Sequence, residues 1–342
     1  MKVCFIIQHP AHVHYFKNLI FSVSAKNKVY TYVIEKDVNI SLLNSYGIKH
    51  KIIGKSSSSM MRKLFYTFTC IINLIKYFFE IQPNVVLATH SPIPTVAAYI
   101  ANRKIISFTD TEHATLSHKI ADFCTNILFT PTCYIKNNGT KQKRINSYFE
   151  LMYLHPNYYK PEEKIEQYID IKTKYVVMRF ISWGAVHDIG HHGISLEIKK
   201  KAVTLLSRFA RVYISSEDIL PPELEKYRLK VPPSIMHDVL YHASLYFGES
   251  GTMATEAAIL GTPSVRISSL AKLLGNSIEL KDKYKLLYYY DEGVEGLAKC
   301  EEILMDNESK NKWKKRSRIM LKDKIDITKH IIDEILRGKN HE

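Results

Sequence analysis

A small polar turn, Glu249-Ser250-Gly251-Thr252, stands between an apolar run and a stretch with helical spacing. A helix that begins in such a turn leaves main-chain N–H groups without helical partners, and its dipole places partial positive charge there. These groups bind phosphate. Glu256 lies one turn further along, where its carboxylate would reach the hydroxyls of a ribose. The pattern predicts a site for a nucleoside diphosphate, and in particular for a nucleotide sugar.

Three histidines, His9, His12 and His14, alternate directly after the apolar run 2–7, which predicts a buried first strand. Ligands of open α/β sheets bind at the carboxyl ends of strands, and histidine exchanges protons near neutral pH. We expect at least one of the three to face a substrate. The alternative is that one or two cap the next helix or pack beneath the loop. Because His14 is assigned to that helix, the three do not converge, and no metal site is expected.

A second polar cluster follows the next two strands predicted for the same sheet. His90 comes after one strand, and Asp110, Glu112 and His113 come after the other. These side chains therefore lie at the same sheet edge as the first histidines, where they would position or deprotonate a sugar hydroxyl. The alternative for Asp110 is that it caps, with Thr111, a helix that begins near Glu112.

Arg179 and Ser182 end the first strand of the second half of the chain. An arginine at a strand end can bind a diphosphate through two parallel hydrogen bonds. We therefore assign both residues to the nucleotide-sugar site. The alternative for Arg179 is a salt bridge between two domains.

Composition limits the partners and the cellular location of the chain. Its 48 Lys and Arg against 34 Asp and Glu give a net charge of +14, which favours anionic partners. The basic residues are spread over several segments and no nucleic-acid module is visible, so nucleic acid is not expected. Five scattered cysteines indicate a reducing compartment. The first apolar run is too short for a signal peptide, and we expect a cytoplasmic protein.

Strands and helices alternate along the whole sequence, which predicts an α/β protein with parallel sheets. The first half holds predicted strands 2–7, 29–34, 51–53, 85–89, 104–109 and 127–130, and helices 15–25, 38–46, 62–81 and 93–102. The second half holds strands 175–179, 212–215, 245–247 and 264–267, helices 195–209, 237–243 and 253–260, and two C-terminal helices.

The 342 residues suffice for two domains. We predict a Rossmann-like acceptor-side domain over 1–155, a proline-containing linker over 156–174 and a Rossmann-like nucleotide-sugar domain over 175–325. A C-terminal helix over 326–342 packs back on the first domain. The predicted site lies in a cleft between the two sheets.

The chain resembles the bacterial and archaeal domain-of-unknown-function family 354, from the first loop to Lys324–Asp326. The segments that carry the resemblance are His9–Lys17, Tyr153–His155, Met178–Arg179, His237–Ala243 and Gly248–Pro263. That family is similar to the GT-B superfamily of glycosyltransferases and UDP-N-acetylglucosamine 2-epimerases.

The resemblance implies a GT-B fold and assigns roles to several residues. Ser250, Gly251 and Thr252 would contact the diphosphate, Glu256 the ribose, and Arg179 the phosphates. His12 would act as the base or orient the acceptor, with Asp110 or Glu112 assisting. A UDP-sugar is the favoured donor, and no metal or other cofactor is required.

The epimerases of the superfamily carry a His-Gly-Asp-Thr loop whose aspartate is catalytic. Here the loop reads His90-Ser91-Pro92-Ile93, without the carboxylate. This difference favours glycosyl transfer over epimerisation. A non-catalytic protein that binds nucleotide sugar or glycan is the remaining alternative.

The predicted helix 62–81 is apolar over most of its circumference. One face packs on the sheet, and the remainder is covered either by another helix or a homodimer partner, or by an anionic membrane. We assign a peripheral membrane contact to 55–81 and to the basic run 310–318, on the inner face of the cell membrane. This position would suit a lipid-linked acceptor.

Overall fold

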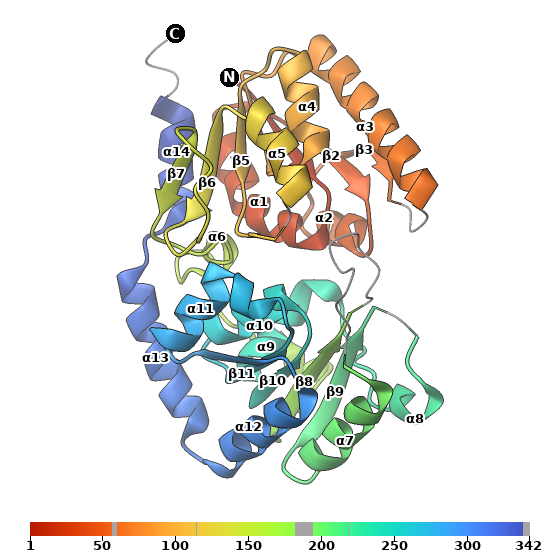
Figure 1. The fold of residues 1–342 in the computed structure, drawn as a ribbon, viewed down its shortest axis with the longest axis vertical. Helices are drawn as coiled ribbons and strands as arrows, with labels where there is room; N and C mark the ends of the chain where they lie inside the picture. Colours follow the sequence, from red (N-terminus) through yellow and green to blue (C-terminus); the bar gives the residue numbers. More distant parts are fainter. Residues whose placement is uncertain (57–59, 114, 182–193, 218, 338–342) are drawn as a thin grey trace. The chain divides into compact units, whose positions relative to one another are not determined.

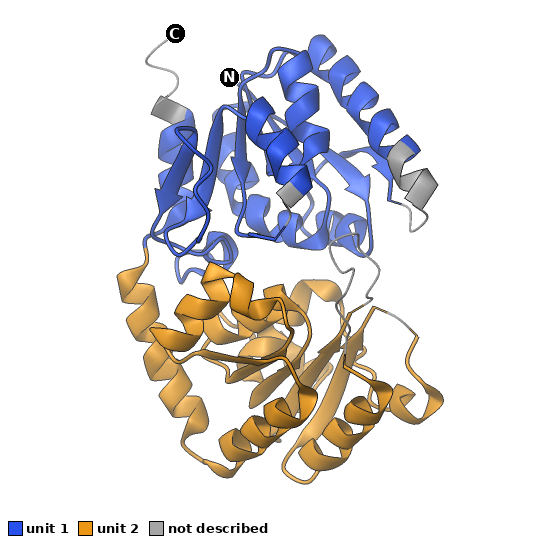
Figure 2. Cartoon of the chain, viewed as in Figure 1, with its two compact units in different colours: residues 1–158, 325–342 blue, residues 159–324 orange. Residues whose placement is uncertain are grey.

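The computed structural model of the chain describes residues 1–56, 60–113, 115–181, 194–217 and 219–337. They form two compact units: unit 1 comprises residues 1–158 and 325–342, and unit 2 comprises residues 159–324 (Figure 1, Figure 2). Each unit is built on one parallel sheet with helices packed against it. The α/β class predicted from the alternation of strands and helices is confirmed.

The sheet of unit 1 has seven strands in the order β3-β2-β1-β4-β5-β6-β7. All of its strand pairs are parallel, with Val3 of β1 opposite Val29 of β2 and Val85 of β4. The strands are β1 Lys2–Ile7, β2 Lys28–Glu35, β3 Lys51–Lys55, β4 Val85–Thr89, β5 Ile105–Phe108, β6 Ile127–Pro131 and β7 Gln142–Ile145. Because both faces are covered, the central strands are continuous apolar runs.

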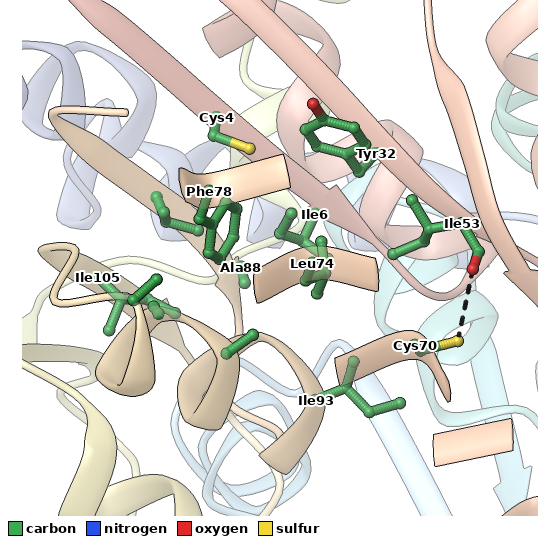
Figure 3. Packing of buried hydrophobic residues seen from close by; sticks show 14 of the residues in the cluster. Cys4, Ile6, Tyr32, Ile53, Cys70, Leu74, Phe78, Ala88, Ile93 and Ile105 are labelled. Atoms are coloured by element: carbon green, nitrogen blue, oxygen red, sulfur yellow. Dashed lines mark hydrogen bonds between the residues drawn. The ribbon is translucent and has the colours of Figure 1, made fainter. Parts of the chain in front are cut away.

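The two faces of this sheet are covered by different helices (Figure 1). On one face, Phe5 of β1 contacts Phe16 of α1. On the other face, Cys4 and Ile6 pack with residues of α3, including Phe78 (Figure 3). The helices of the first face are α1 Pro10–Ser24, α2 Asn39–Ser45, α6 Leu151–Leu154 and α14 Ile327–Arg337, and those of the second are α3 Met60–Ile81, α4 Pro92–Ile100 and α5 Thr115–Cys124.

The sheet of unit 2 has five parallel strands in the order β12-β11-β10-β8-β9. Its strands are β8 Tyr175–Phe180, β9 Arg211–Ser216, β10 Leu245–Gly248, β11 Ser264–Ile267 and β12 Leu287–Tyr290. Its α-helices are α7 Leu196–Leu206, α8 Pro222–Glu225, α9 Met236–His242, α10 Gly251–Ile259, α11 Gly275–Asp282, α12 Gly293–Met305 and α13 Ser309–Asp323. Three 3-10 turns, Glu163–Gln167, Pro233–Ile235 and Ala271–Leu273, complete the described elements of the unit.

Several elements differ from the sequence-based prediction. The first helix begins at Pro10, not Tyr15, because proline at the first helical position is pre-set for helix formation. The edge strands β7 and β12 were not predicted, since their residues are only partly buried and give no apolar run. The end of the chain holds four helices, α11–α14, where two were predicted.

The segment 156–174, predicted as a linker, is divided between the units after Tyr158. Most of it packs into unit 2, where Ile165 is 1% and Ile169 is 2% exposed. The prolines of this segment prevent regular helices and strands, which is why the sequence is typical of a linker, but the backbone is still packed in the unit. The last segment, 325–342, belongs to unit 1, where α14 packs against α1 and α6.

Candidate functional site

The candidate acceptor-side residues of unit 1 lie where its strand order reverses. The chain leaves β1 towards β2 and leaves β4 towards β5, although β1 and β4 are neighbours. Ligands of open α/β sheets bind at such a switch point, beyond the carboxyl ends of the strands. The loop after β1 and the loop after β4 contact each other there, because the Ser91 hydroxyl donates to Gln8 Oε1 at 2.6 Å.

His12 is held at this switch point with one ring nitrogen occupied. The main-chain amide of Gln8 donates to His12 Nδ1 at 3.2 Å, and the Thr89 hydroxyl lies 3.4 Å from the same nitrogen. Burial, assisted by the positive charges of His9 and Lys36, holds the pKa of His12 well below its ordinary value. Because Nδ1 accepts the amide proton, the neutral ring carries its own proton on Nε2. His12 is therefore a neutral hydrogen-bond donor.

The two neighbouring histidines have local structural contacts. His9 is the N-cap of α1, and its Nδ1 accepts the main-chain amide proton of Ala11 at 3.2 Å. His14 is buried, with its ring 5.3 Å from that of Tyr153 and its Nδ1 3.3 Å from the Tyr46 hydroxyl. Capping and packing, the alternatives left open by the sequence, account for these contacts.

His90 belongs to a buried network in the order Ser–His–Asp. Its Nδ1 lies 2.9 Å from the Ser107 hydroxyl, and its Nε2 lies 2.9 Å from Asp122 Oδ1. Asn138 donates to both oxygens of Asp122 at 3.1 Å. Ser107 is fully buried within β5 and is also bonded to the Thr125 hydroxyl. A nucleophile must reach its substrate, so this network fastens β4, β5 and α5 together without providing a hydrolytic triad.

The acidic residues after β5 lie in different surroundings. Glu112 is buried, and its Oε1 accepts the main-chain amide proton of Ile135 at 3.2 Å. Asp110 is half-buried at the carboxyl end of β5. Helix α5 begins at Thr115, three residues later than predicted, so Asp110 does not occupy its N-cap position. His113 is half-buried beside this helix. Burial is the main cause of the lowered pKa of His118, and the positive charge of His113 adds a small part.

The candidate phosphate turn lies at the corresponding switch point of unit 2, between β8 and β10. Strand β10 ends at Gly248, where a Cβ atom would lie 2.4 Å from the carbonyl oxygen of Arg179. Ser250 is the N-cap of α10 and accepts the main-chain amide proton of Met253 at 3.3 Å. Gly251 and Thr252 are the first two helical residues, whose amides point away from any helical carbonyl. A helix therefore begins at the predicted turn, but two residues earlier than residue 253, where the sequence placed its start.

Glu249 points into unit 2. It is 1% exposed, and its carboxylate oxygens accept main-chain amide protons from Ile181 at 3.1 Å and Ile194 at 2.5 Å. These hydrogen bonds hold Ile181, which follows β8, and Ile194 against the phosphate turn. The carboxylate supports the turn from within the unit, whereas the sequence assigned it to the nucleotide sugar.

Glu256 is buried in a polar cluster of unit 2. His237 Nε2 lies 3.1 Å from Glu256 Oε1, and both residues are 4% exposed. The ring of His237 packs edge-on against Tyr159, whose hydroxyl donates to Asp238 at 2.7 Å. One oxygen of Glu256 is thus held by His237, a partner that the sequence did not identify.

Arg179 is engaged by residues of its own unit. Its Nη1 donates to the Ser215 hydroxyl at 2.8 Å, and its Nη2 pairs with Glu217 Oε1 at 2.5 Å. The salt bridge is therefore within unit 2, and the sequence-based alternative of a bridge between domains is wrong. Ser182, the other residue assigned to this strand end, lies outside the described residues.

A second arginine, Arg266 in β11, lies against the phosphate turn and was not predicted. It is 7% exposed, and its Nε donates to the carbonyl oxygen of Glu249 at 3.4 Å. Burial lowers its pKa to about 10. The signal in the sequence is an arginine inside the short apolar strand Ser264–Ile267, where a charged residue requires a reason.

Comparison with known proteins identifies relatives and the fold. The model of a protein family described as "Protein of unknown function (DUF354)" matches residues 1–337. An uncharacterized protein of Methanocaldococcus jannaschii is 24% identical over 305 residues, which cover 83% of this chain and 86% of that protein. Within the described residues, no group of three His, Cys, Asp or Glu side chains is arranged to hold a metal ion.

Two solved structures illustrate the fold similarity. The UDP-GlcNAc 2-epimerase from Neisseria meningitidis bound to UDP-GlcNAc has a TM-score of 0.72 at 13% identity, covering 98% of this chain and all of that chain (100%). The spinosyn rhamnosyltransferase SpnG complexed with spinosyn aglycone has a TM-score of 0.60 at 10% identity, covering 95% of this chain and 98% of that chain. At such low identities the likeness shows the architecture alone, and the predicted GT-B fold with two parallel sheets is confirmed.

Proposed function

The chain belongs to the DUF354 family of proteins of unknown function, and we propose that it is a glycosyltransferase. It would move a sugar from a nucleotide-sugar donor to a glycan or lipid-linked acceptor in bacterial surface-polysaccharide biosynthesis. The observation that carries this proposal is the start of α10 at the switch point of unit 2. There Ser250 caps the helix, and Gly251 and Thr252 begin it.

On the donor side, the chemistry required is the departure of a nucleoside diphosphate. The N-terminus of α10 offers main-chain amides and a positive dipole end to the charge that develops on the leaving phosphate. This stabilisation requires no divalent ion. The solved epimerase with the same fold is bound to UDP-GlcNAc, which favours UDP as the nucleotide.

On the acceptor side, His12 has a more specific role than the sequence could assign. Its Nδ1 accepts the Gln8 amide proton, so Nε2 carries a proton and can donate it in a hydrogen bond. A ring in that state orients an acceptor hydroxyl and does not deprotonate it. Asp110, half-buried at the carboxyl end of β5, is the residue we propose as the base, while Glu112 is held by a main-chain amide.

Epimerisation of a UDP-sugar is the second candidate, favoured by the similarity of the fold to a UDP-GlcNAc 2-epimerase. The loop after β4 counts against it. In that loop Pro92 is the first residue of α4, and neither Ser91 nor Ile93 supplies the missing carboxylate. A non-catalytic role in binding nucleotide sugar or glycan is the third candidate.

A peripheral membrane position would suit a lipid-linked acceptor. Helices α3, α4 and α5 pack side by side on unit 1, and their outer surface carries large exposed apolar side chains. Six of these are Phe65, Phe68, Ile72, Phe79, Leu116 and Phe123. Lys76 and Lys119 are exposed on the same helices, which suits an anionic lipid surface. None of the described helices is long and apolar enough to span a bilayer.

The basic run 310–318 supports membrane contact less well than the α3–α5 surface. Lys310 Nζ donates to the carbonyl oxygens of Tyr241 and Ala243, each at 2.6 Å. Trp313 is buried, and Arg316 donates to the carbonyl oxygen of Lys285 at 2.9 Å. Much of this run fastens α13 to unit 2, so we place the membrane contact on unit 1.

Activity assays separate the three candidate functions. The purified protein is incubated with UDP-sugars, alone and with a membrane extract that supplies acceptors. Release of UDP that depends on the extract supports the transferase, whereas sugar interconversion without acceptor supports the epimerase. The absence of turnover under both conditions leaves only the binding role. His12→Ala should abolish transfer and leave UDP binding unchanged; full turnover by this variant would refute the role of His12.

Flotation with phosphatidylglycerol vesicles tests the membrane contact. The double substitution Phe68→Ser and Phe123→Ser removes two aromatic side chains from the α3–α5 surface. It should reduce the bound fraction at least about threefold, because each lost side chain removes apolar burial in the bilayer interface. The matched control is Ile219→Ser, which removes a 93% exposed apolar side chain from unit 2. Equal binding by all three proteins would refute the contact.

A further inference from the structure

Arg266 is the third residue of β11, a central strand of the unit 2 sheet, opposite Gly248 of β10. Residues two apart on a strand share a face, and Ser264 donates to the carbonyl oxygen of Ala254 in α10 at 2.8 Å. Arg266 therefore lies on the α10 side of the sheet. Its Nη1 is 3.4 Å from the hydroxyl of Ser277, in the first turn of α11.

The guanidinium lies flat beneath the first residue of α10. A Cβ atom on Gly251 would be 3.0 Å from Arg266 Cζ and 3.1 Å from each of Nη1 and Nη2. Three nearly equal distances place this Cβ position over the plane of the guanidinium. The glycine at this position is thus explained by the close approach of the arginine, since its φ angle is not in the left-handed region.

Positive charge is concentrated around the Arg266 guanidinium, and no carboxylate among the described residues balances it. Helices α10 and α11 each have a first-turn residue, Gly251 and Ser277, beside the guanidinium, and each helix N-terminus carries partial positive charge. Among the described residues, no carboxylate lies within ion-pair distance of Arg266. Burial without a carboxylate is also the cause of its lowered pKa. Arg179, by contrast, is paired with Glu217.

A buried cation that protein groups do not neutralise destabilises the fold unless an anion binds beside it. We propose that Arg266 is the cation of an anion-binding site at the N-termini of α10 and α11, and that this site takes the diphosphate of a nucleotide. The identity of the anion rests on the proposed function; the existence of an anion site rests on the geometry of unit 2. The role that the sequence gave to Arg179 thus passes to Arg266.

Two substitutions of Arg266 separate charge from packing. Arg266→Met removes the charge and keeps most of the volume, and Arg266→Lys keeps the charge. The matched control, Arg211→Met, changes an exposed arginine that begins β9, an edge strand of the same sheet. Binding of inorganic pyrophosphate, UDP and uridine is measured by titration calorimetry, and thermal unfolding is measured without ligand.

We expect Arg266→Met to weaken binding of pyrophosphate and UDP between about tenfold and a hundredfold, the range for a lost charge-assisted hydrogen bond. The affinity for uridine, which has no phosphate, should change less than about twofold. Arg266→Lys should retain most of the affinity, and Arg211→Met all of it. Without ligand, Arg266→Met should unfold at the same temperature as the wild type or higher, because an uncompensated buried charge has been removed.

Other outcomes overturn one inference or the other. The arginine is structural, and the inference fails, if Arg266→Met without ligand unfolds at a lower temperature than the wild type. The same conclusion follows if this substitution weakens the binding of uridine as much as the binding of UDP. Unchanged pyrophosphate binding by Arg266→Met also refutes it. If the wild type binds pyrophosphate through Arg266 but binds no nucleoside diphosphate, the anion site stands and the proposed function fails.

Discussion

Replacing the buried carboxylate of Glu249 should destabilise unit 2 without weakening nucleotide binding. The sequence assigns this residue to the nucleotide sugar, whereas the structure places it 1% exposed, with its carboxylate accepting two main-chain amide protons. In Glu249→Gln the side-chain NH₂ faces one of those amides, so one buried donor loses its acceptor. This costs about 1–3 kcal/mol, and Glu249→Ala, which orphans both donors and leaves a void, costs about 4 kcal/mol or more.

Thermal and urea unfolding of the protein without ligand measure this cost. For a unit of this size, a loss of about 2 kcal/mol lowers the unfolding midpoint by about 4–8 °C. The matched control is Glu217→Gln, since Glu217 pairs with Arg179 while remaining 37% exposed. An exposed pair contributes less than about 1 kcal/mol.

Nucleotide binding distinguishes the two roles of Glu249. If the carboxylate supports the fold, Glu249→Gln binds UDP normally at temperatures well below its unfolding midpoint. A ligand contact predicts the reverse, namely unchanged stability and lost affinity. Stability of Glu249→Gln within about 0.5 kcal/mol of the wild type, the range of a neutral surface substitution, would refute the reasoning from the two amides.

Three further predictions concern stability. Burial lowers the pKa of His118 to about 4 in the folded protein, so the unfolded chain takes up a proton first and stability present above pH 6.5 is lost as the pH falls. Between pH 7 and pH 5 the free energy of unfolding, measured in urea, should fall by about 2 kcal/mol. His118→Gln should remove this part of the pH dependence. Gly248→Ala places Cβ 2.4 Å from the Arg179 carbonyl oxygen and should cost about 2 kcal/mol or more by thermal unfolding, whereas an unchanged midpoint would contradict the close approach of the strands. Lys310→Met removes the ammonium group that donates to the carbonyl oxygens of Tyr241 and Ala243 and to the Thr262 hydroxyl. The substitution should cost about 2–4 kcal/mol and leave vesicle flotation unchanged. The exposed Lys315→Met is the neutral control.

The local features of the phosphate turn could be predicted from the sequence. The sequence placed a helix after the turn 249–252, and the structure has that helix from Gly251, two residues before the predicted start, because capping and helix start depend on a few consecutive residues. The strand bounds Val85–Thr89 and Ser264–Ile267 were likewise predicted as the structure has them, since buried parallel strands are short apolar runs between breakers. The edge strand Leu287–Tyr290 was missed, since its half-buried tyrosines give no such run.

The partners of the charged site residues could not be predicted, because they come from distant positions in the sequence. Glu249 is bonded by amides 68 and 55 residues away. His237 reaches Glu256 from the preceding helix. Each of these residues has the right type for ligand binding, and only its surroundings show that a protein group already uses it.

By itself, the sequence determined the α/β class, the positions of most strands and the polar turns that follow them, because these depend on periodicity and on short-range backbone chemistry. The tertiary structure decided which ionisable groups remain available for a ligand. Strand order brings Arg266 under the turn at Gly251 and pairs Arg179 with Glu217. Two arginines of the same chemical type thus differ in their surroundings: Glu217 balances the charge of Arg179, whereas no carboxylate among the described residues balances that of Arg266.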